Sequence, residues 1–165
     1  RNMHYLGREY MFYGKYEKAI ETLRKHLALH SATWKDERAA SYRFIGYCYK
    51  KLGKFDEAEE NFLKAILEAD YVREPYYDLG EFYYDNERYL KSAVAFEEML
   101  KIDSRYLNYM SAPKCWGKLP YDYLAYCYYK LGDYGKAIEN TDKALSFGED
   151  ERLSGNKRYF ESKIK

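Results

Sequence analysis

Four stretches of the chain combine apolar and polar residues in the pattern of amphipathic helices, and each stretch is interrupted once by a short polar turn. The turns begin the phrases "YGKYEKAIETL", "LGKFDEAEENF", "NERYLKSAVAF" and "LGDYGKAIENT", which start at Tyr13, Leu52, Asn86 and Leu131. Helical patterning on both sides of a short turn predicts two antiparallel helices. The chain is therefore predicted to contain four helix–turn–helix units.

Each predicted helix pair has a small residue where its two helices cross. In the first helix of the second unit, Ile45 precedes the small residue Gly46, and the aromatic Tyr49 follows three positions later. A small side chain at a crossing lets two helix backbones approach closely. Equivalent small residues in the second helices are Ala19, Ala58, Ser92 and Ala137. The turns are expected to need left-handed dihedral angles, which glycine adopts at little cost.

The spacing of the units is irregular and reveals two insertions. The turn positions are held by Gly14, Gly53, Glu87 and Gly132, so the intervals are 39, 34 and 45 residues. Against a unit of about 34 residues, this places insertions near residues 31–38 and 103–120. Long loops in compact domains often carry function, so the second insertion is a candidate ordered loop. The alternative is that the helix before it simply runs longer.

The units share variants of one sequence pattern, which is an aromatic residue, then Leu-Gly, then tyrosine, alanine and phenylalanine. This pattern resembles the tetratricopeptide repeat, and the resemblance covers nearly the whole chain. It implies an all-α fold, a right-handed α–α superhelix formed by a single domain over residues 1–165. The repeats fall at about 1–33, 37–70, 73–105 and 118–149, and a capping helix follows at about 150–164.

The two ends of the chain lead to different expectations. The last helix combines Leu153, Phe160 and Ile164 with several basic residues, as expected of a helix that covers the open end of a repeat array. The first repeat starts at Arg1, without a start methionine and without a cap. The chain is therefore expected to be a piece of a longer polypeptide, with a preceding element or a partner at this end.

Composition and charge exclude several classes of protein. Of the 165 residues 47% are hydrophobic and 33% are charged, with a formal net charge of +1, which is typical of an ordered protein without a nucleic-acid surface. No apolar run is long enough to span a membrane or to form a signal peptide. Three cysteines without a C-x-x-C pair argue against disulfides and zinc. A cytoplasmic protein without cofactors is predicted.

No arrangement of residues predicts catalysis, so the chain is predicted not to be an enzyme. His26 and His30 are four residues apart, as two metal ligands can be, but solvent-exposed or helix-capping histidines are favoured because no third ligand is nearby. Cys48 and Cys127 hold equivalent positions in two repeats, which favours packing over reactivity. Cys115 lies in the second insertion and is expected to be exposed.

The resemblance to tetratricopeptide repeats also implies a concave groove. The first-helix positions that line it in that family correspond here to His4, Arg8, Arg43, Tyr47, Lys50, Tyr77, Glu81, Tyr84, Asp122, Tyr126 and Tyr129. Such an aromatic groove, basic in its N-terminal half and more acidic in its C-terminal half, suits an extended peptide or a helix. The alternative is a solvated wall without a ligand. Tyr47 stands where carboxylate-clamping co-chaperones use asparagine, which disfavours a receptor for chaperone tails.

A second resemblance concerns four particular sequence segments. The phrases "SATWKDERAASYRFIGYCYKKLG", "REPYYDLGEFYYD", "KLPYDYLAYCYYKLGDYGKAIENTDKAL" and "DERLSGNKRYFE" resemble the repeat region that follows the catalytic domain of bacterial family 2 glycosyltransferases. This resemblance implies an upstream domain that transfers a sugar from a nucleotide donor with a divalent metal held by a D-x-D motif. The chain would be its non-catalytic accessory region, with that domain or another protein as its partner. The alternative is a free-standing adaptor that binds a peptide or helix.

Overall fold

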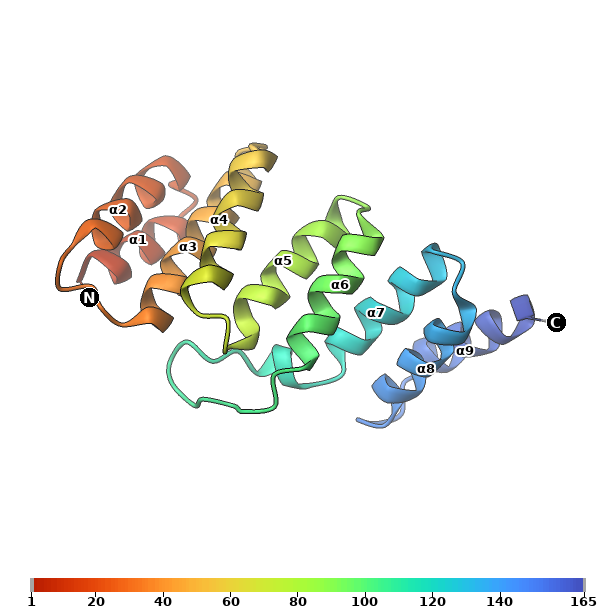
Figure 1. Ribbon diagram of the computed structural model, residues 1–165. Coiled ribbons are helices and arrows are strands. Elements are labelled where there is room, and N and C mark those ends of the chain that lie inside the picture. The colour runs from red at the N-terminus through yellow and green to blue at the C-terminus, as the bar shows by residue number, and fades with distance from the viewer. Residues whose placement is uncertain (1, 165) are drawn as a thin grey trace. The chain divides into compact units, whose positions relative to one another are not determined.

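The computed structural model describes residues 2–164, and the elements found there are helical (Figure 1). The helix pairs are α1 (Asn2–Phe12) with α2 (Tyr16–Ala28), α3 (Lys35–Lys51) with α4 (Phe55–Glu68), α5 (Arg73–Asp85) with α6 (Tyr89–Leu100), and α7 (Leu119–Lys130) with α8 (Tyr134–Leu145). A short 3₁₀ helix, η1 (Pro113–Trp116), precedes α7, and α9 (Glu151–Ile164) ends the described chain. The all-α fold of paired helices predicted from the sequence is confirmed.

The helices of a pair approach closely at the predicted glycines. A Cβ atom built on Gly46 of α3 would lie 2.9 Å from the ring of Phe62 in α4, and one built on Gly80 of α5 would lie 2.8 Å from the ring of Phe96 in α6. Real Cβ atoms do not come this close to an aromatic ring. The small residue is therefore required because a large side chain of the second helix fills the crossing.

The turns between paired helices adopt the expected left-handed conformation. Gly14, Gly53 and Gly132 have φ angles of 71°, 72° and 80°. The equivalent position of the third pair is Glu87, which has a φ of 57° although it is not glycine. The turn geometry is thus conserved within the chain where the residue type is not.

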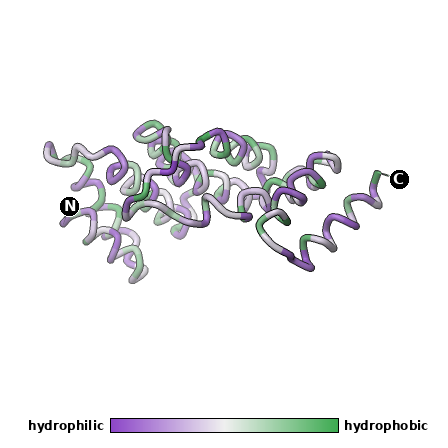
Figure 2. The backbone as a smooth tube through the Cα atoms, turned by 90° about the horizontal axis from the view of Figure 1, so that it is seen from below, coloured by the Kyte–Doolittle hydropathy of each residue, from purple (hydrophilic) through white to green (hydrophobic). Residues whose placement is uncertain are grey.

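Contacts divide the chain into two compact units, each described by itself below. Unit 1 runs to Leu79 and includes the segment Ser104–Met110, and unit 2 consists of Gly80–Asp103 and the chain from Ser111 onward. Along all helices apolar positions alternate with polar ones, as the colours of Figure 2 show. In the described chain, none of the helices combines the length and the apolarity that crossing a membrane requires.

The two insertions differ in structure. In the first, α3 already begins at Lys35, so part of the expected loop is an added helical turn. In the second, α6 ends at Leu100 and the chain runs without helix as far as η1, as the long blue-green loop in Figure 1 shows. The alternative of a longer helix is therefore wrong.

The terminal helix α9 packs against α8. Leu153 and Phe160 are almost completely buried, as expected of the apolar face of such a helix. Ile164, predicted to belong to the same face, is 62% exposed because it lies on the last described turn, beyond these contacts.

Candidate functional site

Unit 2 carries a row of tyrosines that keep part of their surface exposed. We call the following six residues the tyrosine row: Tyr84, Tyr89, Tyr126, Tyr129, Tyr134 and Tyr159. They come from the first helices α5 and α7, from the starts of α6 and α8, and from α9. Helical spacing explains how one helix contributes twice, because Tyr126 and Tyr129 are three residues apart and share a face of α7.

The rings of the row touch one another in sequence. Tyr84 lies 5.5 Å from Tyr126 and 6.0 Å from Tyr89, measured between ring centroids. Tyr126 lies 5.8 Å from Tyr129, which in turn lies 5.8 Å from Tyr159. All four of these pairs are edge-on or tilted, an arrangement that stabilises aromatic pairs and fixes the rings. The row is therefore a rigid aromatic surface.

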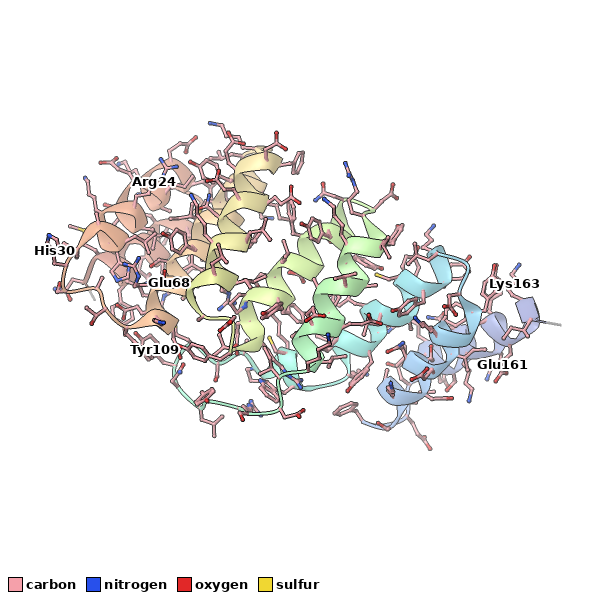
Figure 3. All side chains as sticks on the ribbon, in the orientation of Figure 1. Arg24, His30, Glu68, Tyr109, Glu161 and Lys163 are labelled. Carbon is pink, nitrogen blue, oxygen red and sulfur yellow. The ribbon has the colours of Figure 1, made fainter. Side chains whose placement is uncertain are left out.

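Two lysines lie directly over rings of the row. The ammonium of Lys130 is 5.8 Å from the centroid of Tyr89 and 5.7 Å from that of Tyr126, and the ammonium of Lys163 is 4.8 Å from the centroid of Tyr159. Lys130 follows Tyr126 by four residues on α7, and Lys163 follows Tyr159 by four residues on α9. Figure 3 labels Lys163 on the last turns of α9. These are favourable cation–π contacts, and both lysines are exposed residues.

The acidic residues predicted for this half of the groove already have partners. Asp122 is held in an ion pair by Arg152, with 3.2 Å between Nη1 and Oδ1 in one of its two contacts. Glu81 accepts a hydrogen bond of 3.0 Å from the hydroxyl of Tyr123. The negative charges of these carboxylates are therefore partly satisfied, whereas the two lysines contact rings.

The hydroxyl groups of the row differ in acidity. Burial and the neighbouring Tyr126 raise the pKa of Tyr84 to about 12, so this hydroxyl remains a hydrogen-bond donor at neutral pH. The pKa of Tyr159 is lowered because its hydroxyl hydrogen-bonds with Tyr129 and with Lys163, whose positive charge acts in the same direction. The row therefore offers both donors and acceptors beside its apolar rings.

In unit 1 the predicted groove residues are engaged to different degrees. Arg43 is half-buried and pairs with Asp78 at 2.7 Å, so its charge is largely neutralised. The guanidinium of Arg8 lies 5.2 Å from the ring centroid of Tyr5. Tyr47 is 39% exposed, with the ammonium of Lys51 over its ring at 5.3 Å. Lys50, the one lysine among the predicted groove residues, is half-buried at the end of α3.

Two predicted groove residues are not at a surface, so these predictions were wrong. His4 is completely buried and Tyr77 is only 2% exposed. Neither side chain can contact a partner. The family positions were transferred by spacing alone, and spacing does not show that His4 has buried hydrogen-bonding partners elsewhere in the fold.

A chain of buried hydrogen bonds joins three elements of unit 1. Nε2 of His26 donates to Glu37 over 3.0 Å, so its Nδ1 accepts from the hydroxyl of Ser41 over 2.8 Å. The same hydroxyl oxygen then accepts from Nδ1 of His4, also over 2.8 Å. This assignment leaves Nε2 of His4 as a buried acceptor, and no hydrogen-bond partner for it is found among the described residues.

Burial keeps both histidines neutral. It lowers the pKa of His4 to about 4 and also lowers that of His26, where the nearby Glu37 acts in the opposite direction. Burial tends to raise the pKa of Glu37, but hydrogen bonds from Tyr109 and His26 outweigh it and leave that pKa below its usual range. The network is thus one carboxylate with neutral donors.

Ser41, His26 and Glu37 are the residue types of a hydrolytic triad, but they cannot act as one. Ser41 and His26 are 0% exposed and Glu37 is 4% exposed, so no substrate can reach the hydroxyl. The prediction that His26 is exposed or capping was wrong, because it is a buried network residue. His30 is exposed, as predicted. Within residues 2–164 no group of His, Cys, Asp and Glu could hold a metal ion.

The cysteines are packing residues. Burial raises the pKa of Cys48 to about 12 and that of Cys127 to about 11, so both thiols stay protonated and unreactive at neutral pH. This confirms the packing interpretation. Cys115, expected to be exposed, is also fully buried because η1 turns it inward.

The segment Ser104–Met110, called the strap below, is the part of the second insertion that belongs to unit 1. The amide of Asn108 donates to Asp36 over 2.9 Å, and the hydroxyl of Tyr109 donates to Glu37 over 2.5 Å. Figure 3 shows Tyr109 near the start of α3, where both carboxylates lie. The strap therefore extends the buried network to the surface.

Aromatic contacts also hold the strap. Tyr109 packs against Trp34 and Tyr5 at centroid distances of 5.2 and 6.1 Å. Tyr106 packs edge-on against Tyr71 at 5.8 Å. The prediction that the second insertion contains an ordered loop lying over the helices is confirmed for this segment.

Sequence reasoning missed part of the tyrosine row and both lysines over it. Tyr89, Tyr134 and Tyr159 are not among the predicted groove residues. One signal could have found the lysines, because an aromatic residue followed by lysine four positions later occurs at Tyr47, Tyr126 and Tyr159. Residues so spaced are neighbours on a helix.

Comparison with known proteins agrees with this geometry. Residues 39–69 and 119–150 each match a sequence model of the tetratricopeptide repeat. These segments contain most of α3 and α4 and the whole of α7 and α8. No curated protein matches the chain.

Several solved structures share the fold at low sequence identity. The structure of PilF from Pseudomonas aeruginosa has a TM-score of 0.74 at 18% identity, over 99% of this chain and 68% of that one. MamA of AMB-1 has a TM-score of 0.74 at 15% identity, over 99% and 81%. The N-terminal domain of stress-induced protein-1 from C. elegans has a TM-score of 0.66 at 16% identity, over 77% and 97%.

Proposed function

Because the chain carries tetratricopeptide repeats, we propose that it is a non-catalytic protein-interaction scaffold whose docking surface is the tyrosine row. The observation that carries this proposal is the series of partly exposed, mutually packed rings on unit 2. Tyrosine combines an apolar ring with a hydrogen-bonding tip and loses little entropy on binding. The bound partner is an extended peptide or a helix of another protein.

Selection from a displayed peptide library tests this proposal without knowledge of the natural partner. Peptides selected on the protein should lose at least about tenfold in affinity for a Tyr126→Ala, Tyr129→Ala double variant. A Tyr13→Ala variant is the matched control, since Tyr13 is 76% exposed in a turn of unit 1. Equal binding to the double variant would show that the docking surface lies elsewhere.

A second candidate is that this scaffold is the accessory region of a glycosyltransferase of family 2. The sequence segments quoted above support it, because they include the start of α3, helix α7 and the terminal helix α9. Its partner would then be an upstream catalytic domain. The mass of the native polypeptide separates the two candidates, because a free-standing adaptor would have a mass near 19.8 kDa and a glycosyltransferase one far larger.

A further inference from the structure

The tyrosine row also shows which chemistry its partner has. We propose that the row binds an acidic segment, in which carboxylate side chains meet Lys130 and Lys163 and apolar or aromatic side chains meet the rings. This inference rests on the proposed function, because it names the partner of the same surface.

The first argument is the state of the lysines. Lys130 and Lys163 are exposed, and their ammonium groups contact tyrosines of the row, through the rings for both and also through the Tyr159 hydroxyl for Lys163. By contrast, Lys157 on the same helix α9 forms an ion pair with Asp142 at 2.7 Å. A cation over a ring is positioned without losing its charge, so it can still attract a carboxylate.

The second argument is the state of the nearby carboxylates. Asp122 is paired with Arg152, and Glu81 accepts from Tyr123. Both are thus less available to a basic partner than Lys130 and Lys163 are to an acidic one. Glu87 opposes the inference, because its charge acts on Tyr89 from the turn before α6. Removal of this charge should strengthen binding of an acidic partner.

The third argument is the repetition of the pair. A tyrosine with a lysine over its ring four positions later occurs in α7 at Tyr126 and in α9 at Tyr159. The row thus alternates a flat apolar surface with a positive charge. A segment that alternates carboxylates with apolar side chains is complementary to this surface in both respects.

The test uses two fluorescent synthetic peptides of equal length on the whole chain. In one peptide glutamate alternates with leucine and phenylalanine, and in the other lysine replaces every glutamate. The acidic peptide should bind at least about tenfold more tightly than the basic one, and its affinity should fall as salt is raised.

Single variants assign the effect to the row. Lys130→Glu should weaken binding of the acidic peptide about tenfold, and Glu87→Gln should strengthen it about twofold. Lys136→Glu is the matched control, because Lys136 lies 4.9 Å from the ring centroid of Tyr128, outside the row, and this change should have little effect. Equal loss with Lys136→Glu would mean that only the overall charge matters and would overturn the assignment.

The remaining outcomes separate this inference from the proposed function. Tighter binding of the basic peptide, lost in the Tyr126→Ala, Tyr129→Ala variant, would overturn the acidic preference and retain the docking surface. Binding of neither peptide would overturn the acidic preference, and the library selection would then decide on the surface by itself. Tighter binding of the acidic peptide that the double variant does not weaken would contradict both.

Discussion

The second repeat, in unit 1, and the fourth repeat, in unit 2, are nearly the same phrase, yet their tyrosines have different surroundings. Tyr47 and Tyr126 hold equivalent positions in "YCYKKLG" and "YCYYKLG", and each has a lysine over its ring. Tyr126 also touches three tyrosines of the row. In unit 1 the notable cluster is instead buried and polar, and the strap covers it. The residues of the repeat pattern therefore determine how paired helices cross, while residues outside the pattern determine what each surface presents.

The largest expected effect comes from disrupting the close helix crossing that both units share. Gly46→Leu should destabilise the protein by about 3 kcal/mol, because its side chain would collide with Phe62 at the crossing of α3 and α4. Ala125→Leu should have a similar effect in unit 2. Urea unfolding followed by circular dichroism measures both. Gly155→Ala is the control, since a Cβ atom there would make only an ordinary contact, and unchanged stability of Gly46→Leu would refute the assigned crossing.

The next effect is a pH dependence of stability that comes from the buried histidines of unit 1. The pKa of His4 is about 4 in the folded protein and 6.5 without perturbation, so its neutral form contributes stability that is complete above 6.5 and is lost as the pH falls toward 4. This linkage predicts a loss of about 2 kcal/mol by about pH 5, with a further contribution from His26 in the same direction.

Unfolding measured from neutral to acidic pH checks this prediction. Replacement of His4 by phenylalanine should flatten the pH dependence, whereas His30→Asn should not, because His30 is exposed. Stability that does not change between these pH values would contradict the neutral, buried state of the two histidines.

A smaller effect concerns the strap. Tyr109→Phe removes the hydroxyl that donates to Glu37 and should destabilise unit 1 by roughly 1 to 2 kcal/mol. Amide hydrogen exchange should become faster in the strap and at the start of α3. Tyr13→Phe, in an exposed turn, is the control and should change neither quantity. Equal protection in Tyr109→Phe would mean that the hydroxyl of Tyr109 does not help to hold the strap.

The smallest effect is stabilising. Glu87 has a left-handed φ of 57°, whereas glycine holds the equivalent position in the other three turns. Glu87→Gly should therefore increase stability by about 0.5 kcal/mol, because relief of the strained conformation exceeds the entropy that glycine adds to the unfolded chain. The reverse change, Gly53→Glu, should destabilise. Thermal unfolding measures both, and a lower melting temperature for Glu87→Gly would contradict the argument.

Much of the fold was predictable because it depends on residue patterns within each helix pair. Gly46 and Gly80 mark crossings that their own helix pairs create, and glycine marks three of the four left-handed turns, the exception being Glu87. The buried network was not predictable, because His4, His26 and Ser41 are brought together from three helices. The tyrosine row was found only in part for the same reason, since Tyr89 and Tyr159 become members through contacts with Tyr126 and Tyr129 of α7.

The measurement that tests the central claim most directly is fluorine NMR of the protein labelled with fluorotyrosine, during titration with the acidic peptide. The account predicts that the resonances of Tyr84, Tyr126, Tyr129 and Tyr159 shift together and saturate at one affinity, while those of Tyr13 and Tyr77 stay in place. Shifts confined to tyrosines outside the row, with these four unchanged, would contradict it.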